Sequence, residues 1–194
     1  MEDYFEPAIH IRHNDYNSSL LLKYVDHSSN NTGNGINETV ITLKDDKYPV
    51  TVKLHYVAYD KENIIRTFTE ISHEEKKPVI LSKYASSMLH LNSSKYFLTE
   101  FSGDWAHEAN VTERELAFGK KVIDTKLGAR ANMFVSPFFQ LALDNPSQEN
   151  AGEVLVGTIG WTGNFRFTFE VDNKNELRII LSLIHISEPT RQEA

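Results

Sequence analysis

Apolar and polar residues alternate with a period of two along most of this chain. In residues 50–59 the apolar side chains of Val50, Val52 and Leu54 alternate with polar side chains. Successive side chains of a β-strand point to opposite faces, so this pattern predicts a strand with one buried face. Such half-buried strands are typical of antiparallel sheets.

The same pattern predicts further strands along the chain, and the segments between them are rich in turn residues. The predicted strands cover residues 8–12, 20–25, 39–43, 63–72, 79–91, 96–101, 122–127, 134–143, 154–161 and 165–171. The last two flank Thr162-Gly163-Asn164 and are predicted to form a hairpin. Residues 27–37 are Ser, Asn, Thr and Gly with few apolar side chains, and we expect an exposed loop there. Residues 112–115 resemble a capping box that could begin one helical turn.

The sequence predicts about a dozen strands and no long amphipathic helix. Twisted sheets of that many strands usually divide into two packed layers. We therefore predict an all-β protein, a large antiparallel β-sandwich. The chain has 194 residues, of which 40% are hydrophobic, which is enough for one core and one domain.

The formal net charge of −7 and the scattered Lys and Arg residues argue against a nucleic-acid partner. No apolar run approaches the roughly 20 residues of a membrane-spanning helix, so no membrane partner is expected. The chain has no cysteine, which excludes disulfides and thiolate metal sites. The eight histidines form no HxH or HxxxH pair, and we predict neither a metal site nor a cofactor.

The C-terminal segment has a different character from the rest of the chain. Residues 181–191 resemble the in-frame translation of a sequencing adapter, and residues 192–194 would be an index read in the same frame. We therefore predict a native part in residues 1–180 and an adapter-derived tail in residues 181–194, which is left out of fold reasoning. The alternative is a genuine last strand at residues 179–186.

The candidate chemistry concentrates in residues 97–108. A strand is followed by a Ser-Gly-Asp turn, and Asp104, Trp105, His107 and Glu108 then follow closely. Flat apolar faces next to hydrogen-bonding edges suit a sugar, so Trp105 is a candidate substrate-binding residue. A second strand–Gly–Trp corner occurs at Trp161. In the alternative interpretation both tryptophans brace the sandwich.

Two catalytic arrangements can be drawn from this segment. Ser102, His107 and Asp104 have the residue types of a triad, but no nucleophile elbow accompanies them. Asp104 and Glu108 have the types of a glycosidase acid/base pair, but carboxylates so close in sequence seldom face each other at ~5–9 Å. We therefore assign no catalytic residue.

Four motifs in order carry a family resemblance: Glu6-Pro7-Ala8, the run of residues 96–105, Asn150-Ala151-Gly152-Glu153-Val154, and the run of residues 160–165. Together they resemble the N-terminal domain of the glycoside hydrolase family 36 α-galactosidases (melibiases), over about residues 4–180. The resemblance implies a galactose-mutarotase-like β-supersandwich that packs against a catalytic (β/α)8 barrel of the same chain.

The resemblance also implies a parent enzyme, meaning the full-length protein, that hydrolyses terminal α-1,6-galactosides such as melibiose and raffinose. Family members are retaining enzymes, with one Asp as nucleophile and a second as acid/base, in Lys-Trp-Asp and Cys-Ser-Gly-Gly motifs of the barrel. Neither motif occurs here, so we expect an inactive fragment, incomplete at both ends. We expect the parent enzyme to be a homo-oligomer, namely a tetramer, and to be located in the cytoplasm.

In family members a loop just before the counterpart of Glu6 reaches toward a galactose pocket, often in a neighbouring subunit. Asp3 and Phe5 are the nearest counterparts, and Phe5 stands where many relatives carry Arg. The predicted substrate-binding residues are therefore Asp3 and Trp105.

Two other functions stay open. A non-catalytic carbohydrate-binding β-sandwich would carry exposed aromatic side chains, and a platform of Trp105 and Trp161 would favour it, whereas a buried pair favours the accessory domain. A mutarotase-like epimerase would need a His and a Glu in one cleft, for which His55, His90 and Glu170 are the candidates.

Overall fold

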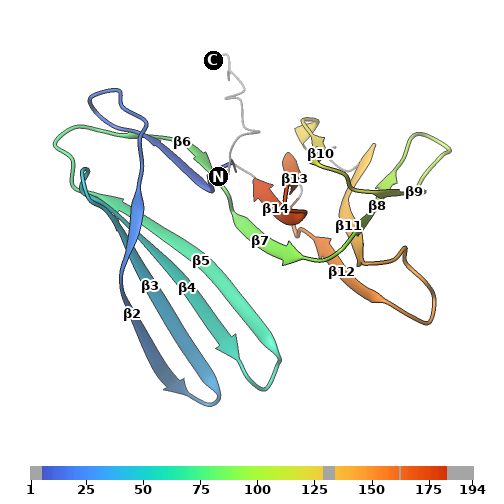
Figure 1. Ribbon diagram of the computed structural model, residues 1–194, viewed down its shortest axis with the longest axis horizontal. Coiled ribbons are helices and arrows are strands. Elements are labelled where there is room, and N and C mark those ends of the chain that lie inside the picture. Colours follow the sequence, from blue (N-terminus) through green and yellow to red (C-terminus); the bar gives the residue numbers. More distant parts are fainter. Residues whose placement is uncertain (1–5, 129–133, 162, 183–194) are drawn as a thin grey trace. The chain divides into compact units, whose positions relative to one another are not determined.

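The computed structural model describes residues 6–128, 134–161 and 163–182, and these ranges are built from antiparallel strands without an α-helix (Figure 1). The all-β prediction is confirmed. The chain divides into two compact units. We call residues 7–87 the meander unit, and Glu6 with the described residues from 88 to 182 the sandwich unit.

The meander unit contains one sheet of four strands in the order β2-β3-β4-β5 and a two-stranded sheet, β1-β6. Its strands are β1 (Ile9–Arg12), β2 (Leu22–Gly33), β3 (Ile36–Asp45), β4 (Val50–Tyr59), β5 (Ile64–His73) and β6 (Ile80–Tyr84). Each strand of the larger sheet pairs with the strand that follows it in sequence (Figure 1). The fully buried residues of its core are Ile11, Val50 and Val52.

A buried polar cluster supports this small core. The ring of His13 lies between the Oε1 of Glu75, 2.6 Å from Nδ1, and the carbonyl oxygen of Ser19, 3.1 Å from Nε2. Tyr48 stacks on the same ring at 3.5 Å and donates a hydrogen bond of 2.9 Å to Asp15. These contacts tie the segment after β1 to the turn after β5.

The prediction of a loop at residues 27–37 is wrong, because β2 and β3 continue through most of this segment. Asn34 and Gly35 have φ values of 55° and 79° and form a two-residue hairpin turn. Positive φ at both positions is the signature of a type I′ turn, for which Asn-Gly is a preferred sequence. The polar side chains pair across the strands in solvent, as in the 3.0 Å contact between the hydroxyls of Ser29 and Thr39.

The sandwich unit consists of two four-stranded sheets, ordered β10-β13-β14-β7 and β12-β11-β8-β9. Its strands are β7 (Ser87–Asn92), β8 (Tyr96–Ser102), β9 (Asn110–Glu115), β10 (Gly119–Thr125), β11 (Val135–Leu143), β12 (Glu153–Thr158), β13 (Phe165–Val171) and β14 (Glu176–Ser182).

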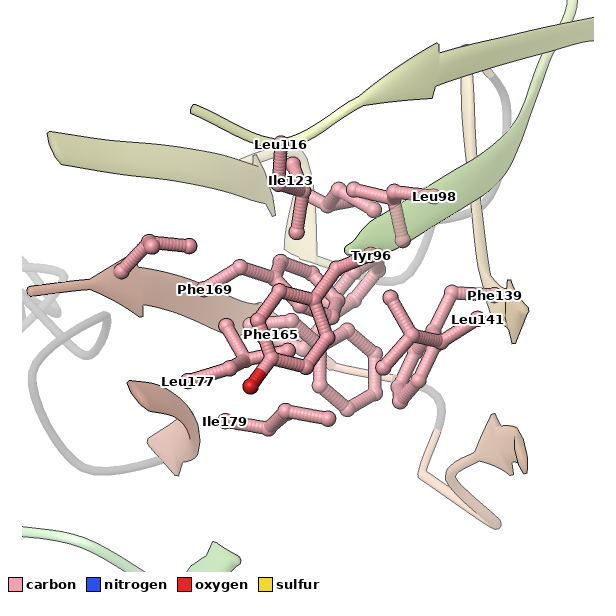
Figure 2. Packing of buried hydrophobic residues seen from close by; sticks show 12 residues of the cluster. Tyr96, Leu98, Leu116, Ile123, Phe139, Leu141, Phe165, Phe169, Leu177 and Ile179 are labelled. Carbon is pink, nitrogen blue, oxygen red and sulfur yellow. The ribbon is translucent and has the colours of Figure 1, made fainter. Parts of the chain in front are cut away.

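The core of this unit lies between the two sheets (Figure 2). The edge of the Phe139 ring on β11 meets Phe167 and Phe169 on β13, at centroid distances of 5.1 and 4.9 Å. The Phe139 ring also crosses Gly157, where a Cβ atom would come within 2.2 Å of it. Tyr96 is buried, and its hydroxyl hydrogen-bonds to the carbonyl oxygens of Leu91 and Asn175 at 3.0 and 2.9 Å. Each such large apolar side chain contributes about 1.5–3 kcal/mol by leaving water.

Two local predictions in this unit are wrong. Residues 154–161 and 165–171 do not form a hairpin, because β12 pairs with β11 whereas β13 pairs with β10 and β14. The chain changes sheets between them, since the Phe-rich face of β13 packs across the core. Residues 112–115 do not begin a helical turn but belong to β9, which pairs with β8.

The predicted strand at residues 79–91 divides into β6 and β7. The last described strand, β14, ends at Ser182 and pairs Leu181 with Phe167 and Ser182 with Arg166. The first two residues of the predicted adapter-derived tail therefore lie in this strand, and residues 183–194 lie outside the described residues.

Candidate functional site

The segment predicted to carry the chemistry forms the loop between β8 and β9. A tight turn closes it, because the backbone N–H groups of Asp104 and His107 each donate to the other's carbonyl oxygen, at 3.1 and 2.9 Å. Ala106 and Ala109 adopt φ values of 62° and 54°. Trp105 stands at the tip of this turn and is 84% exposed.

A pocket of about 330 Å³ opens beside this loop on the sandwich unit. Its lining comes from β8, the loop and β11, and consists of Phe101, Ser102, Gly103, Glu108, Ala109, Ser136 and Phe138. Trp105 lies in the turn between Gly103 and Glu108. The predicted sugar-contacting segment therefore borders a cavity.

A bulge in β11 gives the pocket its shape. Val135 pairs with Ser102 and Phe139 pairs with Glu100, so three residues of β11 lie opposite Phe101 alone. Bulges redirect side chains and are common near functional sites. Here Ser136 and Phe138 both line the pocket, and the rings of Phe138 and Phe101 meet at a tilt of 63° with centroids 5.2 Å apart.

Three polar side chains of the pocket have no hydrogen-bond partner in the described part of the chain. The side chains of Ser102, Ser136 and Glu108 make no hydrogen bond or ion pair with any residue that the structure describes. By contrast, the carboxylate of Asp104 accepts the backbone N–H of Trp105 at 2.7 Å. The uncommitted hydroxyls and carboxylate offer donors and acceptors to a polar ligand.

Neither catalytic arrangement drawn from the sequence forms. The side chains of Ser102, His107 and Asp104 are not hydrogen-bonded to one another within the described ranges. Glu108 lines the pocket and Asp104 does not, so the two carboxylates do not face a common cavity.

The two tryptophans lie in separate loops and are both exposed. Trp161 is 53% exposed and donates a 3.1 Å hydrogen bond from Nε1 to the carbonyl oxygen of Asn164. Its ring covers Gly163, where a Cβ atom would lie 2.5 Å from Nε1. Neither tryptophan is buried, so the interpretation in which both brace the core of the sandwich is wrong.

The remaining site candidates do not converge. Asp3 lies outside the described residues. His55 is on β4 of the meander unit, with Nδ1 3.0 Å from Glu38. His90 on β7 and Glu170 on β13 share a sheet in which β14 separates them, and Glu170 lies 3.4 Å from the amino group of Lys120. Burial and the charge of Arg178 lower the pKa of His90.

The described residues contain no group of three or more His, Cys, Asp or Glu side chains placed to hold a metal ion. No helix in the same ranges is long and apolar enough to span a membrane.

The β11 half of the pocket was not predicted from the sequence, although one signal was available. Pro137 stands within a predicted strand, and a proline in a strand interior indicates a bulge or an edge. Ser136 and Phe138 flank that proline.

Comparisons with known proteins agree with this architecture. The model of the glycosyl hydrolase family 36 N-terminal domain matches residues 1–188. Alpha-galactosidase 2 of Pediococcus pentosaceus is 28% identical over 196 residues, which cover 93% of this chain and 27% of that protein. Probable alpha-galactosidase G of Aspergillus terreus is 25% identical, over 92% of this chain and 26% of that protein.

A similar fold occurs in the crystal structure of the GH36 alpha-galactosidase AgaA from Geobacillus stearothermophilus. It superposes with a TM-score of 0.78 at 23% identity and covers 93% of this chain and 27% of that chain. The present chain therefore spans little more than a quarter of the length of these relatives.

Proposed function

This chain belongs to the glycosyl hydrolase family 36 N-terminal domain family, and from that premise we propose that it is the accessory domain of an α-galactosidase. The match of the family model to residues 1–188 carries the proposal. It is supported by relatives that are named α-galactosidases and are nearly four times as long as the matched region.

The proposed parent enzyme hydrolyses terminal α-1,6-galactosides of the melibiose and raffinose type. Solved structures of AgaA variants in complex with stachyose and with raffinose support this choice of substrate class. The parent is a retaining enzyme, whose nucleophile and acid/base belong to a (β/α)8 barrel that follows this domain in the same chain. It assembles as a homo-oligomer, and its proposed location is the cytoplasm.

The domain itself does not catalyse the reaction under this proposal. A retaining glycosidase needs two carboxyl groups about 5–5.5 Å apart across the scissile bond. Within the described ranges the pocket beside Trp105 is lined by one carboxylate, that of Glu108. The fold therefore supports a structural and positioning role for this chain in the parent.

The direct test is made on DNA. The source gene, recovered from an independent library, is read beyond the codon for Ile180. We expect an open frame that encodes a barrel with Lys-Trp-Asp and Cys-Ser-Gly motifs. A reading that reproduces residues 181–194 and then stops would overturn the proposal.

One observation favours a second function, that of a carbohydrate-binding β-sandwich. Trp105 is 84% exposed and lies in the loop whose residues Gly103, Glu108 and Ala109 line a pocket. Trp161 is also exposed, at 53%, so both tryptophans are accessible to a ligand, as such a module would require.

A further inference from the structure

We propose that the pocket between β8, β11 and the loop of residues 103–109 binds the terminal galactopyranose of an α-galactoside without taking part in its hydrolysis. The choice of galactose rests on the proposed function. The site itself rests on the lining side chains and on Trp105, all of which belong to this chain.

The apolar part of the site suits the C–H face of a sugar ring. Phe101 and Phe138 both line the cavity, and their rings meet at an angle of 63°. Val111 pairs with Phe101 on the same face of the sheet and is 64% exposed, which extends this surface toward β9. Galactose has one face rich in C–H groups, and aromatic rings bind such faces. Because an aromatic ring is flat, it also limits the orientations that the bound sugar ring can adopt.

The polar part suits the hydroxyl groups around the ring edge. The Glu108 carboxylate accepts hydrogen bonds, whereas the hydroxyls of Ser102 and Ser136 both donate and accept. None of the three has a partner among the described residues, so binding would break no existing protein hydrogen bond. A carboxylate beside two hydroxyls matches a pair of neighbouring sugar hydroxyls, each of which donates and accepts.

The loop is held in place before any ligand arrives. The backbone N–H of Gly103 donates to the carbonyl oxygen of Phe134 at 2.9 Å, and the Asn110 amide donates to that of His107 at 2.8 Å. With the turn at residues 104–107, these bonds fix both ends of the segment that carries Trp105 and Glu108. A preformed site loses less conformational entropy on binding than a mobile one.

The size of the cavity favours a single ring. Its volume of about 330 Å³ lies at the lower end of the ~300–1,000 Å³ range of small-molecule pockets. Trp105 is not part of the lining but lies between Gly103 and Glu108, which are, and we expect it to contact the next sugar unit or the aglycone. We therefore expect weak binding, with a Kd of about 1 mM.

The test is ligand-observed saturation-transfer NMR on the 194-residue chain with methyl α-galactopyranoside and melibiose. We expect saturable binding of both sugars that Glu108→Gln weakens at least about tenfold. Trp105→Ala should weaken the binding of melibiose, which has a second sugar unit, at least about tenfold, and should affect methyl α-galactopyranoside less. The matched control is Trp161→Ala, which changes the other exposed tryptophan and is expected to leave the Kd within about twofold. Both Trp105 and Glu108 are exposed, so these variants are expected to keep the melting temperature of the unmodified chain.

Methyl α-glucopyranoside forms a second arm. Equal binding of the glucoside would overturn the assignment to galactose. No saturable binding of any of the three sugars up to about 50 mM, or equal losses in the Trp105→Ala and Trp161→Ala variants, would overturn the site. If the apparent affinity instead follows self-association of the chain, the pocket is a protein contact and the proposal is wrong.

These outcomes are independent of the proposed function. A gene that continues into a barrel, together with a chain that binds no sugar, removes the pocket and keeps the accessory domain. Sugar binding by a chain whose gene stops after residue 194 keeps the pocket and removes the enzyme.

Discussion

The two units of this protein use the same antiparallel pairing but bury their side chains to different extents. The four strands of the meander sheet have 10 to 12 residues each, yet the buried core cluster of that unit contains Ile11, Val50 and Val52. In the sandwich unit, strands β8, β10, β11, β13 and β14 have 7 to 9 residues, and among the described residues they supply eleven of the twelve members of the buried cluster.

The difference shows what alternation along a strand does and does not determine. Period-two alternation gives a strand one apolar face, but each residue of that face is buried only where a second layer packs over it. Along β4, Val50 and Val52 are buried, whereas Tyr56, on the same face, is 42% exposed. The meander unit adds the buried contacts of His13, Glu75 and Tyr48, so its stability depends more on polar groups.

The largest effect is expected in the sandwich core. Phe169→Ala removes a ring that is 1% exposed and should lower the free energy of unfolding by about 3–5 kcal/mol. Urea denaturation followed by near-UV circular dichroism measures it. Phe118, which is 77% exposed, provides the control, and Phe118→Ala should change stability by less than about 0.5 kcal/mol. Similar losses in both variants would contradict the core described for this unit.

The polar cluster of the meander unit should give the next largest effect. Glu75→Gln keeps the shape of a nearly buried side chain but removes the charge beside His13, and we expect a loss of about 2–3 kcal/mol. Hydrogen exchange of the β4 and β5 amides should accelerate, while that of the β13 amides should not. Glu74→Gln, one residue away and exposed, is the matched control. Unchanged protection in the Glu75 variant would show that the cluster does not stabilise this sheet.

A smaller, pH-dependent effect follows from the same carboxylate. Burial tends to raise the pKa of Glu75, but hydrogen bonds from His13 and the Asn14 backbone outweigh it and lower the pKa. Burial also tends to raise the pKa of Asp45. Hydrogen bonds from the backbone N–H groups of Tyr48, Leu21 and Lys47 outweigh this effect and lower the pKa.

A carboxylate with a lowered folded-state pKa contributes stability above its unfolded pKa and loses it as the pH falls through the folded value. We therefore expect the exchange protection of β4 and β5 to fall between about pH 5 and pH 3. The Glu75→Gln variant should show a shallower dependence. Protection that rises on acidification would contradict this assignment.

The smallest effect is expected for an exposed ion pair of the meander unit. Lys23 and Asp46 form a salt bridge, but their side chains are 58% and 57% exposed. A double-mutant cycle with Lys23→Ala and Asp46→Ala should give the smallest coupling of the variants described here, and it should weaken with added salt. A coupling that does not depend on salt and exceeds the loss in the Glu75→Gln variant would mean that surface pairs, rather than buried groups, stabilise this sheet.

The elements that the sequence predicted well are those whose alternation is strong. Residues 50–59 and 165–171 are β4 and β13 with the predicted bounds, because Val52, Phe167 and Phe169 belong to buried faces. The pairing of the strands was harder to predict from the sequence. The hairpin between β12 and β13 was wrong because pairing depends on how the Phe-rich face of β13 packs across the core. The β2–β3 hairpin was missed although Asn34-Gly35 signals it.

The site could be predicted in part for a related reason. The loop with Trp105 and Glu108 is contiguous in sequence, so its mixture of aromatic and polar side chains was visible. Ser136 and Phe138 reach the same pocket through a bulge that depends on pairing with β8, a contact between residues more than thirty positions apart. The signal from Pro137 marks a bulge but does not show which loop it faces.

The most direct test compares hydrolysis of a chromogenic α-galactoside by the 194-residue chain and by the product of the extended gene. We expect turnover by the extended product and none by the chain, because the proposed function assigns the two carboxylates of a retaining glycosidase to a part of the parent enzyme outside this domain. Hydrolysis by the chain that is lost on Glu108→Gln or Asp104→Asn would contradict the proposed function and place the chemistry in the loop that carries Trp105.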